Sequence, residues 1–227
     1  MTQRRLVSLA DVKVTMAIVD SLALRTDIIS FIAETVRGKD VLDAGCADHQ
    51  AERQSDPRWL HKHIKGSARS VVGLELLESE AVKLRQRGFN VIVGDAVTAD
   101  LGCTFDVIVA GELIEHIDNP GGFIRNMRRH LKHGGQLVIT TPNPFFALHW
   151  VEWFLLSSQL RERWNLEHVG WYDPFTLGNL LERCGLKVEG IYYFARSRKT
   201  LAVLHALHLP CPRPLASSFV AVARLPS

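Results

Sequence analysis

Three acidic residues, Asp43, Glu75 and Asp95, each stand at the end of a short apolar run. An ionised carboxylate only accepts hydrogen bonds, so Glu75 could receive both hydroxyl groups of a ribose. Asp95 and the neighbouring Ala96 could face adenine, whose exocyclic amine needs an acceptor. Gly45, two residues after Asp43, would let the backbone approach a ligand closely. One such acid alone would most simply be a solvated loop residue, but three in equivalent positions favour a nucleoside site.

The turn after the first apolar run excludes the commonest dinucleotide motif. Residues 45–50 read GCADHQ, whereas a nicotinamide-dependent dehydrogenase needs GxGxxG at this place to cradle a pyrophosphate. A single glycine favours a nucleoside without phosphates and disfavours a nicotinamide oxidoreductase.

A second group of reactive side chains lies in the run GELIEHI at residues 111–117. On a helical turn, Glu115 and His116 stand three and four residues after Glu112, so the three side chains could face one point. Two carboxylates and an imidazole suit Mg²⁺, Mn²⁺ or Zn²⁺. Without a metal, His116 could serve as the base that a hydroxyl nucleophile needs.

The elements that position these residues alternate between strands and helices. We predict strands at 41–42, 71–74, 91–93, 105–110 and 136–141, with two more at 188–195 and 219–225. Helical patterns cover 25–36, 79–87, 122–132 and 173–185, the last with Asp173 as N-cap and Pro174 at its first position. This alternation predicts an α/β fold with a doubly wound, mostly parallel seven-stranded sheet, which binds ligands beyond the carboxyl ends of its strands.

As a set, six motifs resemble the class I S-adenosylmethionine-dependent methyltransferases, which have a Rossmann-like fold. They are VLDAGCAD (41–48), VVGLE (71–75), VGDA (93–96), FDVIVAGELIEHI (105–117), LKHGGQLVITTPNPF (131–145) and DPFTLGNLLERCGL (173–186). The resemblance implies S-adenosyl-L-methionine as cofactor, with its methionine part near Gly45, its ribose on Glu75 and its adenine near Asp95. The cofactor-binding residues it implies are Asp43, Gly45, Ala47, Glu75, Asp95, Ala96, Ala110 and Gly111.

The run ending in His116 resembles the ExxEH element of two metal-using branches of this family. One branch contains ubiquinone-biosynthesis O-methyltransferases, and the other methylates the 3′-terminal ribose of small RNAs. The resemblance implies Glu112, Glu115, His116 and His168 as ligands of a divalent metal. Without a metal, His116 or His168 would act as the general base.

The acceptor is less closely defined. Residues 145–164, rich in Phe, Trp and Leu, begin a predicted helical cap (145–172) that could cover the acceptor or touch a membrane surface. Few basic residues there disfavour nucleic acid, so we expect O-methylation of a small, sugar-linked or lipid-linked metabolite. N-methylation and 2′-O-methylation of an RNA 3′ end stay open. His49, where the family usually has glycine, also leaves open a catalytically silent nucleoside-binding or partner module.

Composition sets the outer limits. The 227 residues are 47% hydrophobic and 22% charged with a net charge of +3, which indicates one globular domain (1–227) with an N-terminal helical segment (1–37). Four scattered cysteines fit a reducing compartment, and we find no signal peptide or spanning segment, so we expect a cytoplasmic protein. His61 and His63 are expected at an exposed helix end rather than at a metal.

Overall fold

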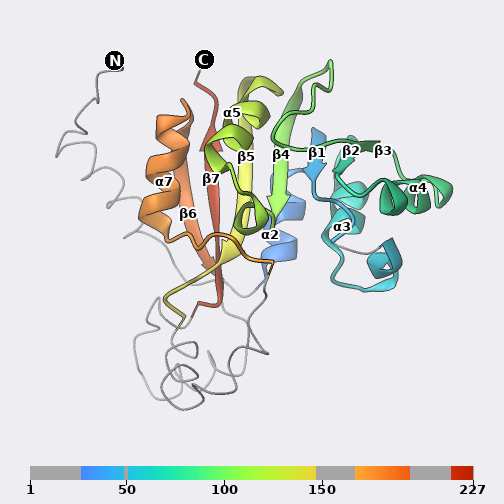
Figure 1. The fold of residues 1–227 in the computed structure, drawn as a ribbon, viewed down its shortest axis with the longest axis horizontal. Coiled ribbons are helices and arrows are strands. Elements are labelled where there is room, and N and C mark those ends of the chain that lie inside the picture. The colour runs from blue at the N-terminus through green and yellow to red at the C-terminus, as the bar shows by residue number, and fades with distance from the viewer. Residues whose placement is uncertain (1–26, 49–50, 147–166, 195–215, 227) are drawn as a thin grey trace, which may run out of the picture.

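The computed structural model, which describes residues 27–48, 51–146, 167–194 and 216–226, contains a seven-stranded sheet (Figure 1). The strand order is β3-β2-β1-β4-β5-β7-β6. The first five strands in this order are parallel, and β7 runs antiparallel to both of its neighbours. Their bounds are β1 (Asp40–Ala44), β2 (Ser70–Glu75), β3 (Val91–Val93), β4 (Phe105–Gly111), β5 (Leu131–Pro142), β6 (Lys187–Phe194) and β7 (Ser218–Arg224). The predicted doubly wound, mostly parallel sheet is confirmed.

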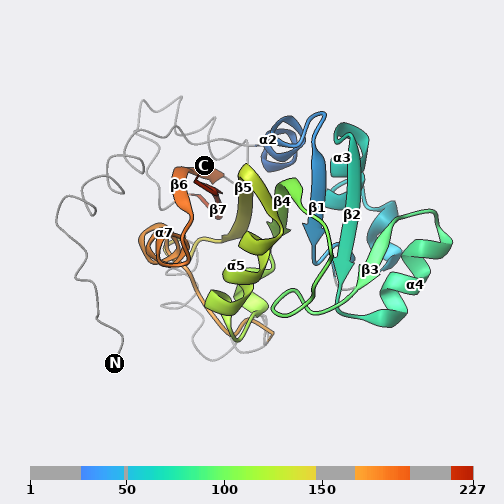
Figure 2. The ribbon, with the colours of Figure 1, turned by 90° about the horizontal axis from the view of Figure 1, so that it is seen from above.

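Helices cover both faces of this sheet, as the view in Figure 2 shows. Helices α2 (Ile28–Thr35) and α3 (Leu60–Ser67) lie on one face, and α5 (Pro120–Arg129) and α7 (Pro174–Arg183) lie on the other. Helix α4 (Glu78–Gln86) packs beside the edge strand β3. The side chains of β5 alternate between the two cores: Val138 packs with α2 and α3, whereas Leu137 and Ile139 pack with α5 and α7.

Side-chain caps fix where two of these helices begin. Asp173 accepts hydrogen bonds from the backbone N–H groups of Phe175 and Thr176, which starts α7 at Pro174 as the sequence predicted. Asn119 accepts from the backbone N–H of Gly122 at the start of α5. These caps set the angle at which the loops on the ligand-binding edge enter the helices.

Two local predictions need correction. The predicted helix over 122–132 ends at Arg129, and the residues after it belong to β5, where Leu131 pairs with Phe105. The Phe105 N–H donates to the His130 carbonyl (2.8 Å), so sheet hydrogen bonds replace the last helical turn. Around His61 and His63 only an exposed helix end was expected, and the bounds of helix α3 were not predicted, because its short sequence LHKHIKGS carries few apolar residues.

Some predicted features lie outside the described residues. These are residues 1–26 of the N-terminal segment, residues 147–166 of the cap with most of the proposed membrane-touching stretch, and His49. Within the described ranges, no helix has the length and apolar character needed to span a bilayer.

Candidate active site

The carboxyl ends of the central strands meet at one edge of the sheet. Ala44 in β1 aligns with Leu74 in β2 and with Ala110 in β4, and Glu75 aligns with Val93. The loops that follow these strands therefore lie side by side. They carry the residues that the sequence singled out for a nucleoside and for catalysis.

A cavity of about 310 Å³ opens at this edge between the turn after β1, the start of α3, helix α2 and the residues after β4. Its lining includes Asp43, Gly45, Asp48 and Glu112. Gly45 has a φ of +77°, and a Cβ built there would lie 3.1 Å from Leu113 Cδ1, so both conformation and space favour glycine at this turn.

The histidine at position 61 is the main site residue whose environment the sequence did not reveal. His61 is buried, and its Nδ1 lies 2.8 Å from Oδ2 of Asp43, which is also buried. Its Nε2 is buried too and has no hydrogen-bond partner within the described parts of the chain. The expectation of an exposed helix end is thus wrong for His61, and His63 is half-buried. The signal missed was the pairing of a strand-end acid, Asp43, with a histidine of α3.

The turn after β1 is held from both sides. Trp59 Nε1 donates to the Cys46 carbonyl (2.9 Å), and the backbone N–H of Ala47 donates to Glu75 Oε2 (3.1 Å). The other oxygen of Glu75 accepts from the N–H of Leu77 (3.1 Å). Glu75 is therefore a buried acceptor that ties the end of β2 to the turn that follows β1.

The loop after β3 is fixed in a similar way. Asp95 Oδ1 accepts from the N–H of Val97 (2.8 Å), and the Ala96 carbonyl accepts from Asn126 Nδ2 on α5 (3.1 Å). Glu75 and Asp95 thus follow neighbouring strands at the same edge, as the nucleoside hypothesis requires.

At the end of β4, Ala110 is fully buried and Gly111 lines the cavity. A Cβ on Gly111 would come within 2.8 Å of Leu60 Cδ2, so glycine lets α3 approach the strand closely. Gly111 therefore reaches the cavity, whereas Ala110 is packed in the core beneath it and is not among the lining residues.

The structure turns Glu112 and Glu115 towards opposite faces of β5. Only Ile114–His116 forms a helical turn (η2), and Glu112 precedes it with a left-handed φ of +47°, so the predicted continuous turn from 112 to 116 is absent. Thr140 Oγ1 donates to Glu112 Oε1 (2.8 Å), whereas Thr141 Oγ1 donates to Glu115 Oε2 (3.1 Å). Neighbouring strand residues face opposite ways, which explains the separation.

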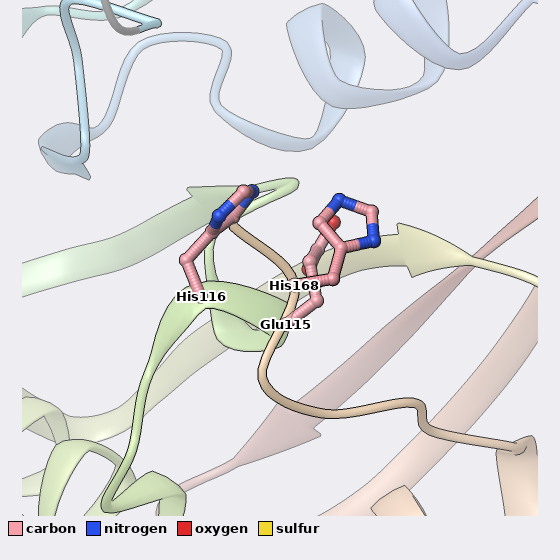
Figure 3. Close-up of side chains that lie close together, drawn as sticks. All are labelled: Glu115, His116 and His168. Atoms are coloured by element: carbon pink, nitrogen blue, oxygen red, sulfur yellow. The ribbon is translucent and has the colours of Figure 1, made fainter. Parts of the chain in front are cut away.

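Three of the four predicted metal-ligand or base residues do converge. One ligand atom from each of Glu115, His116 and His168 lies within 4.8 Å of the others, whereas Glu112 does not belong to this group. Figure 3 shows these side chains meeting from η2 and from the segment that precedes α7. We call these three residues the histidine cluster.

Backbone hydrogen bonds bring His168 to this place. The N–H groups of Val169 and Gly170 donate to the Glu115 carbonyl (2.8 and 3.1 Å), and His116 Nδ1 lies 3.2 Å from the Glu167 carbonyl. The His116 and His168 rings are nearly perpendicular, with their centroids 4.8 Å apart. Two segments about fifty residues apart in the chain therefore form one site.

The electrostatics of the two glutamates differ from those of surface acids. Burial, together with the negative charge of Glu112, raises the pKa of Glu115 to about 8. Burial also raises the pKa of Glu112, and Asp48 adds to this effect. Solvent nevertheless reaches Glu112, because its side chain lines the open cavity. Glu115 Oε1 is buried without a hydrogen-bond partner among the described residues.

The histidine cluster has two chemical capacities. An imidazole at this edge can take a proton from a hydroxyl group that approaches the cavity. The set of two imidazoles and one carboxylate also fits a divalent ion that accepts both nitrogen and oxygen ligands. The unpartnered Glu115 Oε1 is the kind of buried oxygen that such an ion would satisfy.

Comparisons with known proteins agree with this geometry. Residues 20–190 match the model of a family described as a methyltransferase domain. The chain is 30% identical over 165 residues to a ubiquinone biosynthesis O-methyltransferase of Pseudomonas aeruginosa, over 68% of this chain and 67% of that protein.

Two solved structures share the fold. One is a SAM-dependent methyltransferase from Archaeoglobus fulgidus (TM-score 0.59, 19% identity, 86% of this chain and 90% of that one). The other is the N-methyltransferase NodS from Bradyrhizobium japonicum with S-adenosyl-L-homocysteine (TM-score 0.57, 13% identity, 96% and 88%). With the family match over three quarters of its length, this chain belongs to the class I S-adenosylmethionine-dependent methyltransferases.

Proposed function

We propose that this methyltransferase transfers the methyl group to a hydroxyl oxygen of a small metabolite. The observation that carries the proposal is the convergence of Glu115, His116 and His168 beside the cofactor edge of the sheet. A hydroxyl is a weak nucleophile until it loses its proton, and this cluster supplies groups that can accept one. An amine acceptor would need less help of this kind.

The cofactor assignment follows the order of the strands. Glu75 and Asp95 end or follow β2 and β3, so we assign the ribose to Glu75 and the adenine to Asp95 and Ala96. The methionine part then extends towards β1 and β4, into the cavity lined by Asp43, Gly45 and Gly111. This orientation directs the methyl group towards the residues after β4, where the histidine cluster lies.

In the proposed reaction an imidazole nitrogen of His116 or His168 accepts the proton of the acceptor hydroxyl. The oxygen then forms a bond to the methyl carbon, and the electron pair of the carbon–sulfur bond passes to sulfur, which becomes a neutral thioether. The transfer is an in-line displacement, so much of its rate comes from holding oxygen, carbon and sulfur in line in a site that excludes water.

A divalent metal would fit the same cluster. Glu115, His116 and His168 would hold it, and the ion would lower the pKa of a bound hydroxyl and orient a neighbouring oxygen, as in a vicinal diol or catechol. The printed name of the P. aeruginosa relative, an O-methyltransferase, also supports a hydroxyl acceptor. We therefore propose a small, sugar-linked or lipid-linked molecule with adjacent oxygens.

The test is a methyl-transfer assay with labelled S-adenosylmethionine and three acceptors: a catechol, a phenol with one hydroxyl, and an aromatic amine. Each is measured with chelator and with added Mg²⁺, Mn²⁺ or Zn²⁺. We expect catechol O-methylation in the wild type and a 10²- to 10⁴-fold lower kcat/KM, roughly, in His116→Ala and His168→Ala. Binding of S-adenosylmethionine should stay unchanged in both variants.

His133→Ala is the matched control, because this exposed histidine lies at the opposite end of β5. Its activity should stay within about twofold of wild type, as for other surface changes far from the reaction. Methylation of the amine alone, or full activity of both cluster variants, would contradict O-methylation by this cluster. Full activity with chelator would exclude the metal but leave the imidazole base.

A further inference from the structure

The cavity assigned to the methionine part is rich in carboxylates. Asp43, Asp48 and Glu112 all line it, and Arg58 is the one lysine or arginine among its described lining residues. The Arg58 guanidinium donates to both oxygens of Asp56 (3.3 and 3.2 Å). His61, whose Nε2 is fully buried without a partner in the described ranges, lines the same cavity. The lining therefore carries more negative than positive groups.

Glu112 is held in this lining by its backbone and by one side chain. Its φ of +47° is a left-handed conformation that a non-glycine residue rarely adopts. The Glu112 N–H donates to Thr140 Oγ1 (2.9 Å), and the same hydroxyl donates to Glu112 Oε1 (2.8 Å). These contacts fix the carboxylate on the cavity side of β5, away from the histidine cluster.

Glu112 lines the cavity next to Gly111, and Glu115 of the histidine cluster lies on the other face of β5. The negative charge of Asp48, on the cavity side, raises the pKa of Glu112, and Glu112 in turn raises the pKa of Glu115 in the histidine cluster. Glu112 is therefore within electrostatic reach of both groups. A cofactor whose methionine part fills this cavity would share it with the Glu112 carboxylate.

We propose that Glu112 is a specificity-determining residue whose carboxylate faces the sulfonium, so that the enzyme binds S-adenosylmethionine more tightly than its product S-adenosylhomocysteine. The inference rests on the proposed placement of the methionine part in this cavity. The cofactor and the product share the adenosine, the ammonium and the carboxylate, and they differ by the methyl group and by the positive charge on sulfur. Their affinity ratio therefore isolates the contribution of that charge.

The expected size follows from electrostatics. A carboxylate a few ångströms from a cation in a partly solvated site changes an affinity by roughly tenfold. A nearby cation also favours the ionised form of Glu112. After methyl transfer the sulfur is neutral and this attraction disappears, which would assist product release.

The experiment is titration calorimetry at pH 8 with S-adenosylmethionine, S-adenosylhomocysteine and sinefungin, in which an amine-bearing carbon replaces the methyl sulfonium. We expect Glu112→Gln to lower the preference for S-adenosylmethionine over S-adenosylhomocysteine about tenfold. Sinefungin should lose affinity as S-adenosylmethionine does. Glu112→Asp, which keeps the charge, should retain most of the preference.

Glu34→Gln is the matched control: it removes the same charge from the exposed face of α2, whose Ile28 and Ile32 line the cavity. Its affinity ratio should equal that of the wild type. Equal weakening of both ligands in Glu112→Gln, or a wild type without any preference, would overturn the inference. A wild type that binds neither ligand would instead contradict the cofactor placement itself. Circular dichroism and a melting curve confirm that each variant is folded.

Discussion

Acidic side chains at the two ends of the central sheet differ in whether a cation lies beside them. At the amino end, Asp40 and Asp106 are bound by cations: Lys132 Nζ lies 2.8 Å from Asp40 and 3.0 Å from Asp106, and Arg69 contacts both. Hydrogen bonds from Arg69, Lys132 and Ser70 hold the pKa of Asp40 below its usual range. The pKa of Asp106 is lowered as well, by a hydrogen bond from the backbone N–H of Asp40 and by one from the side chain of Lys132.

At the carboxyl end, Glu112 and Glu115 accept hydrogen bonds from threonine hydroxyls, and their pKa values are raised. The difference lies in what surrounds each carboxylate, since the residue types are similar. Acids that stabilise the fold are neutralised within the protein. The two glutamates that we propose to face a cationic cofactor or a metal have no cation beside them among the described residues, which costs stability in the free protein.

The largest effect that would test this contrast is the pH dependence of Glu115. A carboxyl group whose pKa is raised to about 8 binds its proton more tightly in the folded state. The contribution of this protonated carboxyl group to the free energy of unfolding is fully present below about pH 4.5 and is lost as the pH rises through 8. Glu115→Gln cannot ionise, so it should gain stability relative to the wild type across this range. The gain should be a few kcal/mol, with about 5 kcal/mol as the upper limit.

Urea unfolding between pH 5 and 9, with chelator present, measures this difference. Glu78→Gln, which changes an exposed glutamate at the start of α4, is the control and should run parallel to the wild type. If the curves for Glu115→Gln and wild type also stay parallel, Glu115 is not an uncompensated acid.

A smaller effect is expected from the buried pair of Asp43 and His61. His61→Leu removes the hydrogen bond to Asp43 and leaves a buried carboxylate without that partner. It should destabilise the protein by about 1–3 kcal/mol and weaken cofactor binding, because Asp43 lines the cavity. His133→Leu, which changes an exposed histidine of β5, serves as the control in chemical denaturation. Equal stability of the two variants would mean that the pair contributes nothing.

The smallest effect belongs to the amino end. Lys132→Met removes ion pairs to Asp40 and Asp106 that are partly open to solvent. We expect a melting temperature lower by about 1–3 °C at neutral pH. The loss should shrink in 1 M salt, which screens exposed charges, and also as the pH falls below about 4 towards the lowered pKa values of Asp40 and Asp106. A larger loss that salt does not change would show that packing of the lysine stem dominates.

Much of the fold and of the cofactor edge could be predicted from the sequence because the information is local. Glu75 is the last residue of an apolar strand, and Asp95 lies two residues after another. Both acids therefore reach the ligand-binding edge in any parallel sheet. Asp173 and Pro174 likewise fix the start of α7 by contacts within four residues. These features depend only on residues that are close in the sequence, so they can be predicted without knowing which distant segments come into contact.

The placement of Glu112 and His61 depends on distant contacts. The left-handed backbone at Glu112 is supported by Thr140, 28 residues away. The helical spacing therefore wrongly placed the Glu112 side chain together with those of Glu115 and His116. His61 is buried by Asp43 and by the rings of Trp59 and Phe89, which short-range periodicity does not reveal. His168 reached the cluster as the family resemblance implied, through backbone bonds to Glu115.

The two threonines at the end of β5 have a mechanical consequence. Thr140 and Thr141 are adjacent, and the strand that carries them is paired with β4 on one side and β7 on the other. Because neighbouring strand residues face opposite ways, the two hydroxyls hold Glu112 and Glu115 on opposite sides of one peptide unit. The backbone of one strand therefore fixes how far the glutamate of the cavity stands from the glutamate of the histidine cluster.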